Sequence, residues 1–487
     1  MSHRVAIIGG GITGLTCAFK LSQSKEFESG NLHITVLESR PRFGGVIETL
    51  YTHGCIIDCG PDSFITNKTF MLDLARQLGI EEQIIGVNKK HRGALIVNQG
   101  KFVPLPKGFV MLAPTNLRAF FQSPILSIGG KLRAALDLVL PRRSDNKEES
   151  LAAFVRRRFG QELLDRLAQP MVAGIYVGDA DCLSANYTAA RFVEMERTAG
   201  SVIKALRQEQ SAADGSKNEG AQSSGARYSL FASFEQGMAV IVDALIAALD
   251  KPNIDLRLSA PVQSVSARNS EGRSFAISLT DELIEVDQLV ITTSAATASA
   301  LSEQLNAKVS GALKQIPAAS SAVATFIFES NQFGRPLDAF GAVVPEVEMK
   351  KYKINSLAFN FASVKFPRAP ENKVVIRAFL GGINKADLLA CDDNKLIEMA
   401  LSDLRLLLKL TGQPQYQALH RWADSMPQYQ LGHEALIKEI EAELTGGALH
   451  LGGAYFSGVG LPDCVANGSD CALRVLKTSG SSCNLPN

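Results

Sequence analysis

Residues 4–15 read Arg-Val-Ala-Ile-Ile-Gly-Gly-Gly-Ile-Thr-Gly-Leu, and this stretch decides the fold of the N-terminal part of the chain. Its apolar run at 5–8 is typical of a strand that is buried on both faces of a parallel sheet. A helix-forming segment at 13–22 follows, and then an apolar strand at 33–37 that ends in Glu38. Strand, glycine turn, helix, strand and acid, in this order, are the context in which G-x-G-x-x-G indicates dinucleotide binding.

The three glycines of this motif have different physical roles. Gly9 allows a tight turn, Gly11 lets the backbone approach a pyrophosphate, and Gly14 lets the helix pack closely on the strand. The helix N-terminus offers free N–H groups to the phosphates, and Glu38 can accept hydrogen bonds from a ribose hydroxyl. A βαβ unit without a ligand is the alternative, and the correctly placed acid argues against it. We assign the first cofactor contacts to Gly9, Gly11, Ile12, Thr13, Gly14, Glu38 and Ser39.

The residues after Glu38 indicate which dinucleotide binds. Arg42 and the pair Gly44-Gly45 follow closely, and this Glu-x-x-x-Arg-x-Gly-Gly pattern resembles the amine-oxidase-like FAD enzymes. In that superfamily the arginine and the glycines approach the phosphate and ribityl part of the flavin cofactor. Residues 58–62, Asp-Cys-Gly-Pro-Asp, resemble the superfamily's loop beside the flavin. The resemblance therefore implies FAD, with Arg42, Gly44, Gly45, Gly60, Pro61 and Asp62 among its contacts.

Length and composition describe an ordinary globular protein with more than one core. The chain has 487 residues, of which 46% are apolar and 20% charged, and it is too long for a single core. The net charge of +1 gives no reason to expect nucleic acid or a strongly acidic partner. The N-terminus enters a strand at once, so we expect no signal peptide, and no apolar run reaches the roughly 18 residues of a membrane span. We expect a cytoplasmic protein, either free or bound peripherally to a membrane.

The cysteines stand apart from one another and predict no metal site. The eight of them form no C-x-x-C pair, and no histidine has the spacing of a zinc site. Cys55 and Cys59 share a segment but lack partners for a four-ligand site. We therefore expect reduced thiols and no metal.

Lys68 is a candidate contact for an anionic substrate group. Apolar residues recur at helical spacing over 67–78, which predicts a helix with Lys68 at its start. A lysine in a helix's first turn opposes the helix dipole. Lys68 is therefore either a solvated surface residue or a residue that points toward the flavin cleft.

Residues 94–103 predict a β-hairpin, and 112–140 predict an amphipathic helical stretch. The helical stretch has many apolar side chains with basic ones around them. It forms either a helical core or a surface that rests on the bilayer interface or guides an apolar substrate. We expect breaks in it at Pro114, at Pro124 and at Gly129-Gly130.

The second half of the helical region is expected to contain two loops. Ser150 should cap a helix that continues to Pro170. Residues 171–179, Met-Val-Ala-Gly-Ile-Tyr-Val-Gly-Asp, should follow as a loop between helices, where the glycines permit close approach of the backbone or close helix packing. Residues 208–226 are poor in apolar side chains and predict a mobile surface loop.

The C-terminal half completes the nucleotide-binding unit. Strands are predicted at 254–258 and 288–293, and further strands between 305 and 425 predict a substrate domain with an antiparallel or mixed sheet. A glycine loop at 458–463 precedes a helix at 464–476, and such a loop can aim N–H groups at a flavin.

Similarity to FAD proteins with two dinucleotide folds implies two more contacts in this half. Val262 supplies its backbone N–H and C=O to the adenine edge, and residues Thr292 to Ala295 turn beneath the FAD. The remaining cofactor contacts are Val262, Thr292, Gly453, Gly458, Val459, Gly460 and Pro462.

These predictions give an α/β fold. It combines a Rossmann-like FAD/NAD(P)-binding domain, assembled from discontinuous segments, with an α+β substrate domain and a helical insertion. The expected boundaries are 1–88, 226–304 and 429–487 for the FAD-binding domain, 89–106 and 305–428 for the substrate domain, and 107–225 for the helical insertion.

Four motifs narrow the resemblance: Gly60-Pro-Asp-Ser-Phe64 with Lys68, Gly174-Ile-Tyr-Val-Gly-Asp179 with Leu183-Ser184, Trp422 with Pro427-Gln-Tyr429, and Gly458-Val-Gly-Leu-Pro-Asp-Cys464. Together they resemble the oxygen-dependent porphyrinogen oxidases of haem synthesis over nearly the whole chain. Within this family the chain most resembles the bacterial, Gram-positive-like branch, in which a lysine follows the Gly-Pro-Asp-Ser-Phe loop as Lys68 does here. The chain departs from the family pattern at 234–238, where a Gly-Gly pair is more usual, and its 208–226 segment looks longer than typical.

The resemblance implies a reaction and a substrate class. A porphyrinogen loses hydride from a meso carbon to the flavin, and dioxygen reoxidises the flavin and yields hydrogen peroxide. Because the flavin carries the chemistry, no residue of the chain is assigned as catalytic. The protein must hold a flat macrocycle in an apolar cleft with a few cations for its carboxylates. The implied substrate contacts are Lys68, on a propionate, and Gly174, Tyr176 and Gly178. Coproporphyrinogen III is favoured over protoporphyrinogen IX.

Other classes remain open. An amine or polyamine oxidase would share the FAD motifs, but it would usually have a lysine near flavin N5 and an aromatic pair facing the ring, for which Tyr455-Phe456 is suggestive. A non-catalytic flavoprotein that docks with other haem-pathway enzymes would keep FAD and lose turnover. A carotenoid desaturase is disfavoured because no long apolar tunnel is indicated.

Overall fold

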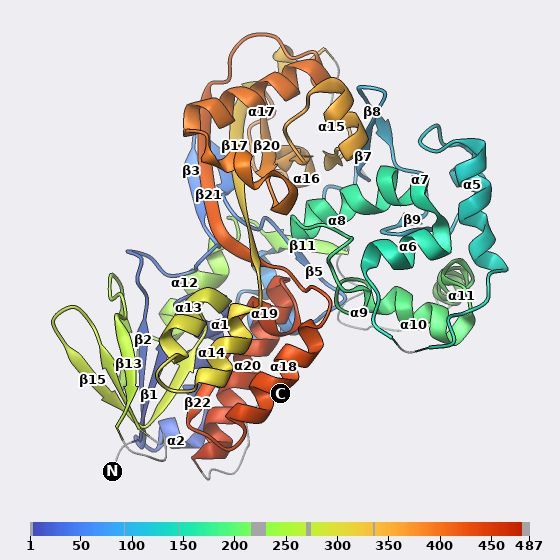
Figure 1. The fold of residues 1–487 in the computed structure, drawn as a ribbon. Helices are drawn as coiled ribbons and strands as arrows, with labels where there is room; N and C mark the ends of the chain where they lie inside the picture. The colour runs from blue at the N-terminus through green and yellow to red at the C-terminus, as the bar shows by residue number, and fades with distance from the viewer. Residues whose placement is uncertain are drawn as a thin grey trace.

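The computed structural model describes residues 3–91, 93–145, 147–215, 230–268, 274–334 and 337–479. Figure 1 shows a lower body around a parallel sheet, an upper part around a long mixed sheet, and a group of helices to one side. Two long strands, β17 (Ala318–Glu329) and β21 (Tyr416–Pro427), run from the upper part toward the lower body.

A five-stranded parallel sheet forms the centre of the lower body. The strand order is β12-β2-β1-β16-β22, and every neighbouring pair is parallel. Along β1 (His3–Ile8), Val5 and Ile7 face one core, whereas Ala6 and Ile8 face the other. Burial on both faces confirms the Rossmann-like part of the predicted fold class. The other strands are β2 (Leu32–Leu37), β12 (Ile254–Arg257), β16 (Gln288–Ile291) and β22 (Leu449–Leu451).

Different layers cover the two faces of this sheet. One core joins the sheet to α1 (Ile12–Leu21), α3 (Phe70–Gln77), α12 (Ala239–Ala248) and α20 (Leu461–Thr478). Helices α1 and α20 approach closely because Gly468 has no side chain, and a Cβ there would overlap the carbonyl oxygen of Thr13. The opposite face is covered by β13 (Ser264–Ala267), β14 (Phe275–Ser278), β15 (Leu283–Val286), α13 (Ala295–Ser302), α14 (Ala307–Lys314) and α18 (His433–Leu444).

The upper part contains a seven-stranded sheet in the order β21-β17-β20-β19-β18-β7-β8. Helix α17 (Asp393–Leu408) packs on one face of it. The other face contacts the hairpin of β3 (Thr49–Thr52) and β4 (Cys55–Asp58), which follows the nucleotide-binding motif in the chain. The remaining strands are β7 (Leu95–Asn98), β8 (Lys101–Pro104), β18 (Gly341–Val343), β19 (Ala358–Asn360) and β20 (Lys373–Gly381).

The group of helices has its own core, which also contains Ile96 and borders Val343 of the upper sheet. Ser150 caps α6 as predicted, because its hydroxyl accepts a hydrogen bond from the N–H of Ala153 at 3.1 Å. Within the described residues, no helix of the chain is long and apolar enough to span a bilayer. The helices are α4 (Leu117–Gln122), α5 (Ile128–Ala135), α6 (Leu151–Phe159), α8 (Gln169–Tyr176), α9 (Ala185–Thr188), α10 (Ala190–Ala199) and α11 (Val202–Gly215).

Two predictions about this helical region are wrong. The helix from Ser150 does not continue to Pro170: it ends at Gly160, whose φ of +92° breaks the helical path. The expected loop at 171–179 begins only at Val177, because α8 runs from Gln169 to Tyr176. Proline is tolerated in a helix's first turn, so Pro170 lies near the start of α8 rather than at the end of a helix.

Two further boundaries in this region also differ from the predictions. Pro114 lies in β10 (Ala113–Pro114), which pairs with β9 (Phe109–Val110) in a short ribbon. The predicted break at Gly129-Gly130 is wrong, because both glycines lie inside α5. The predicted mobile loop at 208–226 is helical as far as Gly215, since its alanine, glutamine and glutamate residues favour helix. Residues 216–226 lie outside the described part of the chain.

Candidate functional site

The glycine turn after β1 leaves an open space in front of helix α1. A side chain on Gly14 would overlap the carbonyl oxygen of Gly9, so the helix packs on the turn only with glycine there. A side chain on Gly11, by contrast, would meet no atom within 4 Å. Gly11 is the residue before α1, and no side chain caps the helix. The first turn of α1, with Ile12 and Thr13, therefore presents backbone to a space that an anionic group can enter.

Glu38 is held in a fixed position beside this turn. Its Oε2 atom accepts the N–H of Gly10 at 2.8 Å, and Oε1 accepts the N–H of Arg40 at 2.9 Å. The hydroxyl of Ser39 donates to Oε1 at 3.3 Å. The carboxylate keeps further lone pairs, so it can also accept a hydrogen bond from a ribose hydroxyl.

Arg42 organises the loop that follows. Its Nη2 atom donates to the carbonyl oxygen of Gly45 at 2.9 Å and lies 2.9 Å from Oε2 of Glu48. The N–H of Gly44 donates to the carbonyl oxygen of Gly10 at 2.8 Å, which brings this loop against the glycine turn. The guanidinium is thus engaged within the protein, and its approach to a cofactor phosphate stays a prediction.

Two further predicted cofactor contacts, Thr292 and Val262, lie near the glycine turn and near Glu38, respectively. The hydroxyl of Thr292 donates to the carbonyl oxygen of Gly9 at 3.0 Å. The N–H of Ala260 donates to the carbonyl oxygen of Glu38 at 2.9 Å, and Val262 follows two residues later. Within the described residues, the backbone N–H and C=O of Val262 have no hydrogen-bond partner. A free peptide edge is what an adenine ring would need.

The cofactor contacts predicted near the C-terminus lie beside or within the start of helix α20. The N–H of Gly453 donates to the side chain of Asn467 at 2.7 Å, and its φ of +137° favours glycine. Gly458, Val459 and Gly460 form the loop before α20. The helix begins at Leu461 and not at Cys464 as predicted, so Pro462 and Asp463 belong to its first turn. Proline suits that position because its missing N–H would have no helical partner.

The loop 60–62 connects the nucleotide-binding part to the upper sheet. Oδ1 of Asp62 lies 2.9 Å from Nζ of Lys365, and Oδ2 accepts a hydrogen bond from Asn360 at 2.7 Å. Burial would raise the pKa of Asp62, but the charges of Lys365 and Arg377 hold it well below its usual range. Pro61 follows Gly60, whose carbonyl oxygen accepts Nη2 of Arg377 at 2.5 Å. The carboxylate is thus tied to the upper sheet, and its contact with the cofactor stays a prediction.

Lys68 meets an acidic partner that the sequence did not indicate. Its Nζ atom lies 2.5 Å from Oδ1 of Asp463, in the first turn of α20. The side chain of Lys68 is 44% exposed and that of Asp463 is 15% exposed. The prediction that Lys68 lies at the start of a helix is wrong, because α3 begins at Phe70 and Lys68 precedes it.

Tyr176 lies close to this ion pair. Burial, and then the charge of Asp463, raises the pKa of Tyr176 to about 12. Its ring centre is 6.3 Å from that of Tyr429, and its carbonyl oxygen accepts Nε2 of Gln428 at 2.8 Å. The end of α8, the end of β21 and the start of α20 thus come together here.

The two glycines predicted to contact substrate lie in different surroundings. Gly174 is exposed within α8, where a Cβ would only touch Val343. Gly178 is buried, and a Cβ there would overlap the side chain of Gln428. Gly178 therefore serves close packing, whereas Gly174 leaves an open surface.

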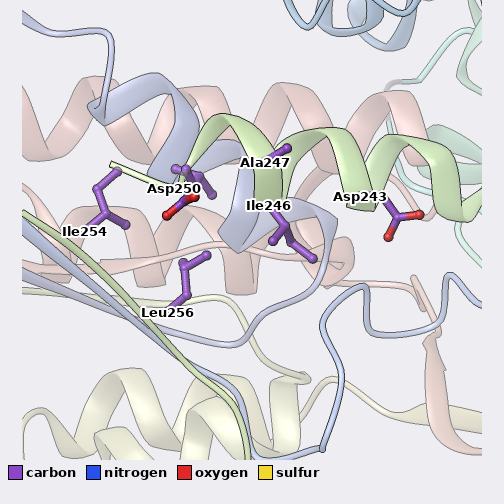
Figure 2. Close-up of a pocket in the computed structure, with 7 residues that line it drawn as sticks. Asp243, Ile246, Ala247, Asp250, Ile254 and Leu256 are labelled. Carbon is purple, nitrogen blue, oxygen red and sulfur yellow. The ribbon is translucent and has the colours of Figure 1, made fainter. Parts of the chain in front are cut away.

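None of these residues lines the cavity of about 570 Å³ that the structure contains. It is lined by α12 and by the edge strand β12, and it is shown in Figure 2. Its polar side chains include Asp243 and Asp250, which would repel a pyrophosphate. This cavity is therefore not a candidate for the dinucleotide.

A family model matches most of the chain. Residues 12–476 match the flavin containing amine oxidoreductases. The chain belongs to this family. Its cofactor is accordingly FAD, as the glycine turn, the fixed acid and the second glycine pair predict.

Individual relatives of this flavin containing amine oxidoreductase also cover nearly its full length. A coproporphyrinogen III oxidase of Bacillus subtilis strain 168 is 30% identical over 95% of this chain and 96% of its own. One of Staphylococcus aureus strain NCTC 8325 / PS 47 is 31% identical over 98% of this chain and 99% of its own. The crystal structure of a protein assigned provisionally as a protoporphyrinogen oxidase, from Exiguobacterium sp. 255-15, has a TM-score of 0.83 and 28% identity, covering 97% of this chain and 98% of that one.

Sequence reasoning missed the partners of the predicted site residues. Asp463 is 395 residues from its partner Lys68, and Lys365 is 303 residues from its partner Asp62. No spacing rule connects positions that far apart. Tyr429 stood within a recognised motif, Pro427-Gln-Tyr429, without a role. Its hydroxyl donates to the carbonyl oxygen of Ala454, beside the C-terminal glycine loop.

Proposed function

We propose that this flavin containing amine oxidoreductase oxidises a porphyrinogen to a porphyrin with dioxygen, and that coproporphyrinogen III is its substrate. The observation that carries the proposal is the similarity to two coproporphyrinogen III oxidases over at least 95% of this chain. This similarity extends through the upper sheet and the helical group, so it is not limited to the dinucleotide motif that many flavoproteins share.

Bound FAD would accept hydride from the porphyrinogen and return the electrons to dioxygen, which leaves as hydrogen peroxide. The chain's own residues bind and orient. The turn at Gly9, Gly11 and Gly14 would receive the pyrophosphate, Glu38 the ribose, and Val262 the adenine edge. The division into FAD-binding segments at 1–88, 226–304 and 429–487 belongs to the same proposal.

The substrate would lie beside Lys68, Tyr176 and Gly174. Lys68 supplies a cation for a propionate, and Asp463 holds its ammonium group in place until the substrate arrives. Tyr176 is neutral at physiological pH, since the ordinary tyrosine pKa of about 10 already lies above it and burial raises the pKa of Tyr176 further, to about 12. Its ring therefore presents an apolar face to the macrocycle and adds no charge.

Protoporphyrinogen IX is the second candidate substrate. The name of the Exiguobacterium protein favours it, since that structure is similar over nearly the whole chain. Coproporphyrinogen III has four carboxylates and protoporphyrinogen IX has two, so a cationic contact such as Lys68 should matter more for the former. An amine oxidase and a non-catalytic flavoprotein remain the alternatives from other classes.

The test is an oxidation assay with each porphyrinogen in turn. Oxygen consumption, hydrogen peroxide and porphyrin fluorescence are followed with the FAD-loaded protein, and primary amines are offered in parallel. Porphyrin fluorescence with peroxide on coproporphyrinogen III supports the proposal. If only an amine gave hydrogen peroxide, the protein would be an amine oxidase and the proposal would be wrong. If no compound were oxidised, the protein would be a non-catalytic flavoprotein.

We also propose that the protein acts in the cytoplasm and contacts a membrane surface through one apolar face. That face is formed by α5 and the turn after it, where Ile128, Leu132, Leu136 and Val139 are 74%, 57%, 46% and 77% exposed. The first three are spaced by four residues and therefore lie on one side of the helix. Exposed apolar side chains in such a row are typical of a helix that rests on the bilayer interface.

A further inference from the structure

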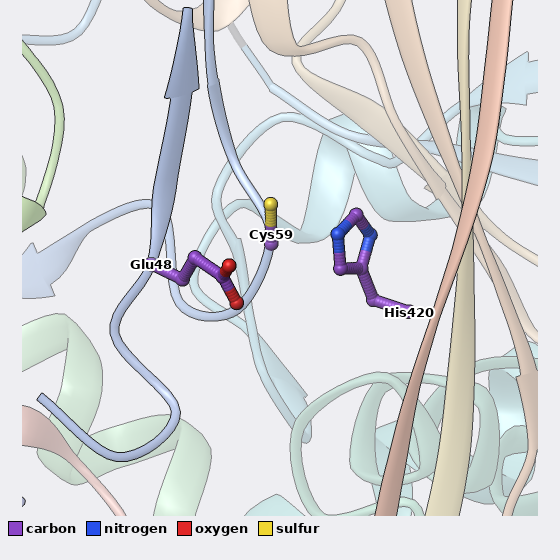
Figure 3. Close-up of side chains that lie close together, drawn as sticks. All are labelled: Glu48, Cys59 and His420. Atoms are coloured by element: carbon purple, nitrogen blue, oxygen red, sulfur yellow. The ribbon is translucent and has the colours of Figure 1, made fainter. Parts of the chain in front are cut away.

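Three side chains of the kinds that bind metal ions come together where the lower body meets the upper sheet. They are Glu48, Cys59 and His420, and their carboxylate oxygen, sulfur and ring-nitrogen atoms lie within 4.8 Å of one another. Figure 3 shows them on three separate segments. Glu48 directly precedes β3, Cys59 directly follows β4, and His420 belongs to β21.

The strand geometry fixes this arrangement. His420 is paired with Val323 of β17, and Val323 packs with Cys59 and Trp422 on one face of the sheet. Because residues opposite each other in an antiparallel pair point to the same face, His420 faces the β3–β4 hairpin. Cys59 is fully buried. The three groups are therefore held by folded strands and not by mobile surface loops.

The ring of His420 faces the other two groups. Figure 3 shows its Nε2 atom, the nitrogen that is not bonded to Cγ, on the side of Cys59 and Glu48. Within the described residues, neither ring nitrogen of His420 has a hydrogen-bond partner. A neutral imidazole can therefore offer the lone pair of Nε2 to a cation.

We propose that Glu48, Cys59 and His420 bind a zinc ion. Carboxylate oxygen, thiolate sulfur and imidazole nitrogen are all zinc ligands, and the thiolate and the imidazole in this set suit zinc better than magnesium or calcium, which prefer oxygen ligands alone. Three protein ligands leave the fourth tetrahedral position to water. The ion would join β21 to the β3–β4 hairpin, which leads directly into the loop 60–62.

Two guanidinium groups limit how tightly this site can bind. Nη2 of Arg42 already lies 2.9 Å from Oε2 of Glu48, which leaves the other carboxylate oxygen as the ligand. Arg377 donates to the carbonyl oxygens of Cys59 and Gly60, so its positive charge is also close. Repulsion between these charges and a divalent cation should make the site weaker than a closed four-cysteine site. The cysteine spacing predicts no metal site, and it does not reveal this one because Glu48 and His420 are 11 and 361 residues from Cys59 along the chain.

The experiment measures zinc retained by the full-length, FAD-loaded protein. The protein is incubated with zinc sulfate, desalted and analysed by inductively coupled plasma mass spectrometry. We expect about one zinc per chain, and less than a tenth of that amount in Cys59→Ser, His420→Ala and Glu48→Gln. The matched controls are Cys182→Ser, at an exposed cysteine, and His33→Ala, at an exposed histidine, which should retain zinc as the wild type does.

X-ray absorption at the zinc edge of the wild-type protein makes the test independent of whether the variants fold. We expect a single sulfur ligand at about 2.3 Å and nitrogen or oxygen ligands at about 2.0 Å. A wild-type protein that retains no zinc, a spectrum without sulfur, or full retention by folded Cys59→Ser would each overturn the proposal. The measurement requires no turnover, so the site stands or falls independently of the proposed porphyrinogen oxidation.

Discussion

Nζ of Lys68 lies 2.5 Å from Oδ1 of Asp463, so the lysine before α3 and the first turn of α20 form one ion pair at the proposed substrate site. The pair is uneven, because Lys68 is 44% exposed and Asp463 is 15% exposed. A substrate carboxylate can therefore reach the ammonium group, but it competes with Asp463 for it. The two residues should consequently have opposite effects on substrate binding.

Lys68→Ala should raise KM for coproporphyrinogen III by about fivefold and leave kcat nearly unchanged, since an exposed charge contact is worth ~1 kcal/mol. Lys68→Arg should restore most of the affinity. Asp463→Asn should lower KM, because Lys68 is then free to pair with the substrate. Steady-state oxygen consumption measures all three. Lys314→Ala, at an exposed lysine of α14, is the control. If Asp463→Asn raised KM as much as Lys68→Ala, the two residues would be acting together as a structural pair.

Gly14→Ala should abolish FAD binding. A Cβ at this position would overlap the carbonyl oxygen of Gly9, and α1 would have to move away from the glycine turn. The ratio of flavin absorbance to protein absorbance after purification measures the FAD content. Gly311→Ala is the matched control, because Gly311 lies within α14 and a Cβ there meets nothing within 4 Å. That control should keep its FAD and gain up to about 1 kcal/mol of helix stability. A Gly14→Ala protein with full FAD content would show that the turn tolerates a side chain.

The parallel sheet and its glycine turn were predictable because the information is local. The apolar run, the glycine pattern and the acid all lie in the first 38 residues, and together they indicate one known structural unit. The ends of helices were less predictable. Pro170 lies in the first turn of α8, where its missing N–H costs nothing, yet the same residue type also ends helices. Only the fold decides between the two.

The partners of the site residues were not predictable for a different reason. Asp62 is tied to Lys365, and Lys68 to Asp463, through contacts that exist only once separate sheets and helices have packed. No periodicity relates such positions. The cluster of Glu48, Cys59 and His420 was missed in the same way, since metal-ligand spacing rules describe ligands that are near in sequence.

The apolar face of α5 should determine attachment to membranes. The double variant Ile128→Ser/Leu132→Ser removes two side chains that are 74% and 57% exposed, so it should fold normally. It should bind vesicles of mixed phosphatidylcholine and phosphatidylglycerol at least about tenfold more weakly than the wild type, because each buried leucine or isoleucine contributes ~2 kcal/mol. Co-sedimentation measures the binding. Leu283→Ser, at an exposed leucine of β15, is the control. Equal binding by the double variant would assign this face to something other than a lipid surface.

His450 should make the nucleotide-binding sheet sensitive to acid. It lies on β22, is 4% exposed, and has Nε2 at 2.7 Å from Oε1 of Gln288. Burial, and then the charge of Arg474, lowers the pKa of His450 to about 4. Between this value and the ordinary histidine pKa of about 6.5, the unfolded chain binds a proton that the folded chain does not. Stability should therefore be unaffected by this group above about pH 6.5 and should fall as the pH drops from there to about 4, by about 3 kcal/mol in total.

Urea unfolding of the wild type and of His450→Gln at several pH values isolates this contribution. Glutamine cannot be protonated, so the difference in unfolding free energy between the two proteins should change by about 3 kcal/mol between pH 7 and pH 4 and then level off. His33→Gln, at an exposed histidine of β2, should show no such change relative to the wild type. A difference that is constant across this range would mean that His450 is protonated in the folded protein as readily as in the unfolded chain. The added proton would then lie on Nδ1 despite the neighbouring charge of Arg474, because Nε2 already donates its hydrogen to Oε1 of Gln288.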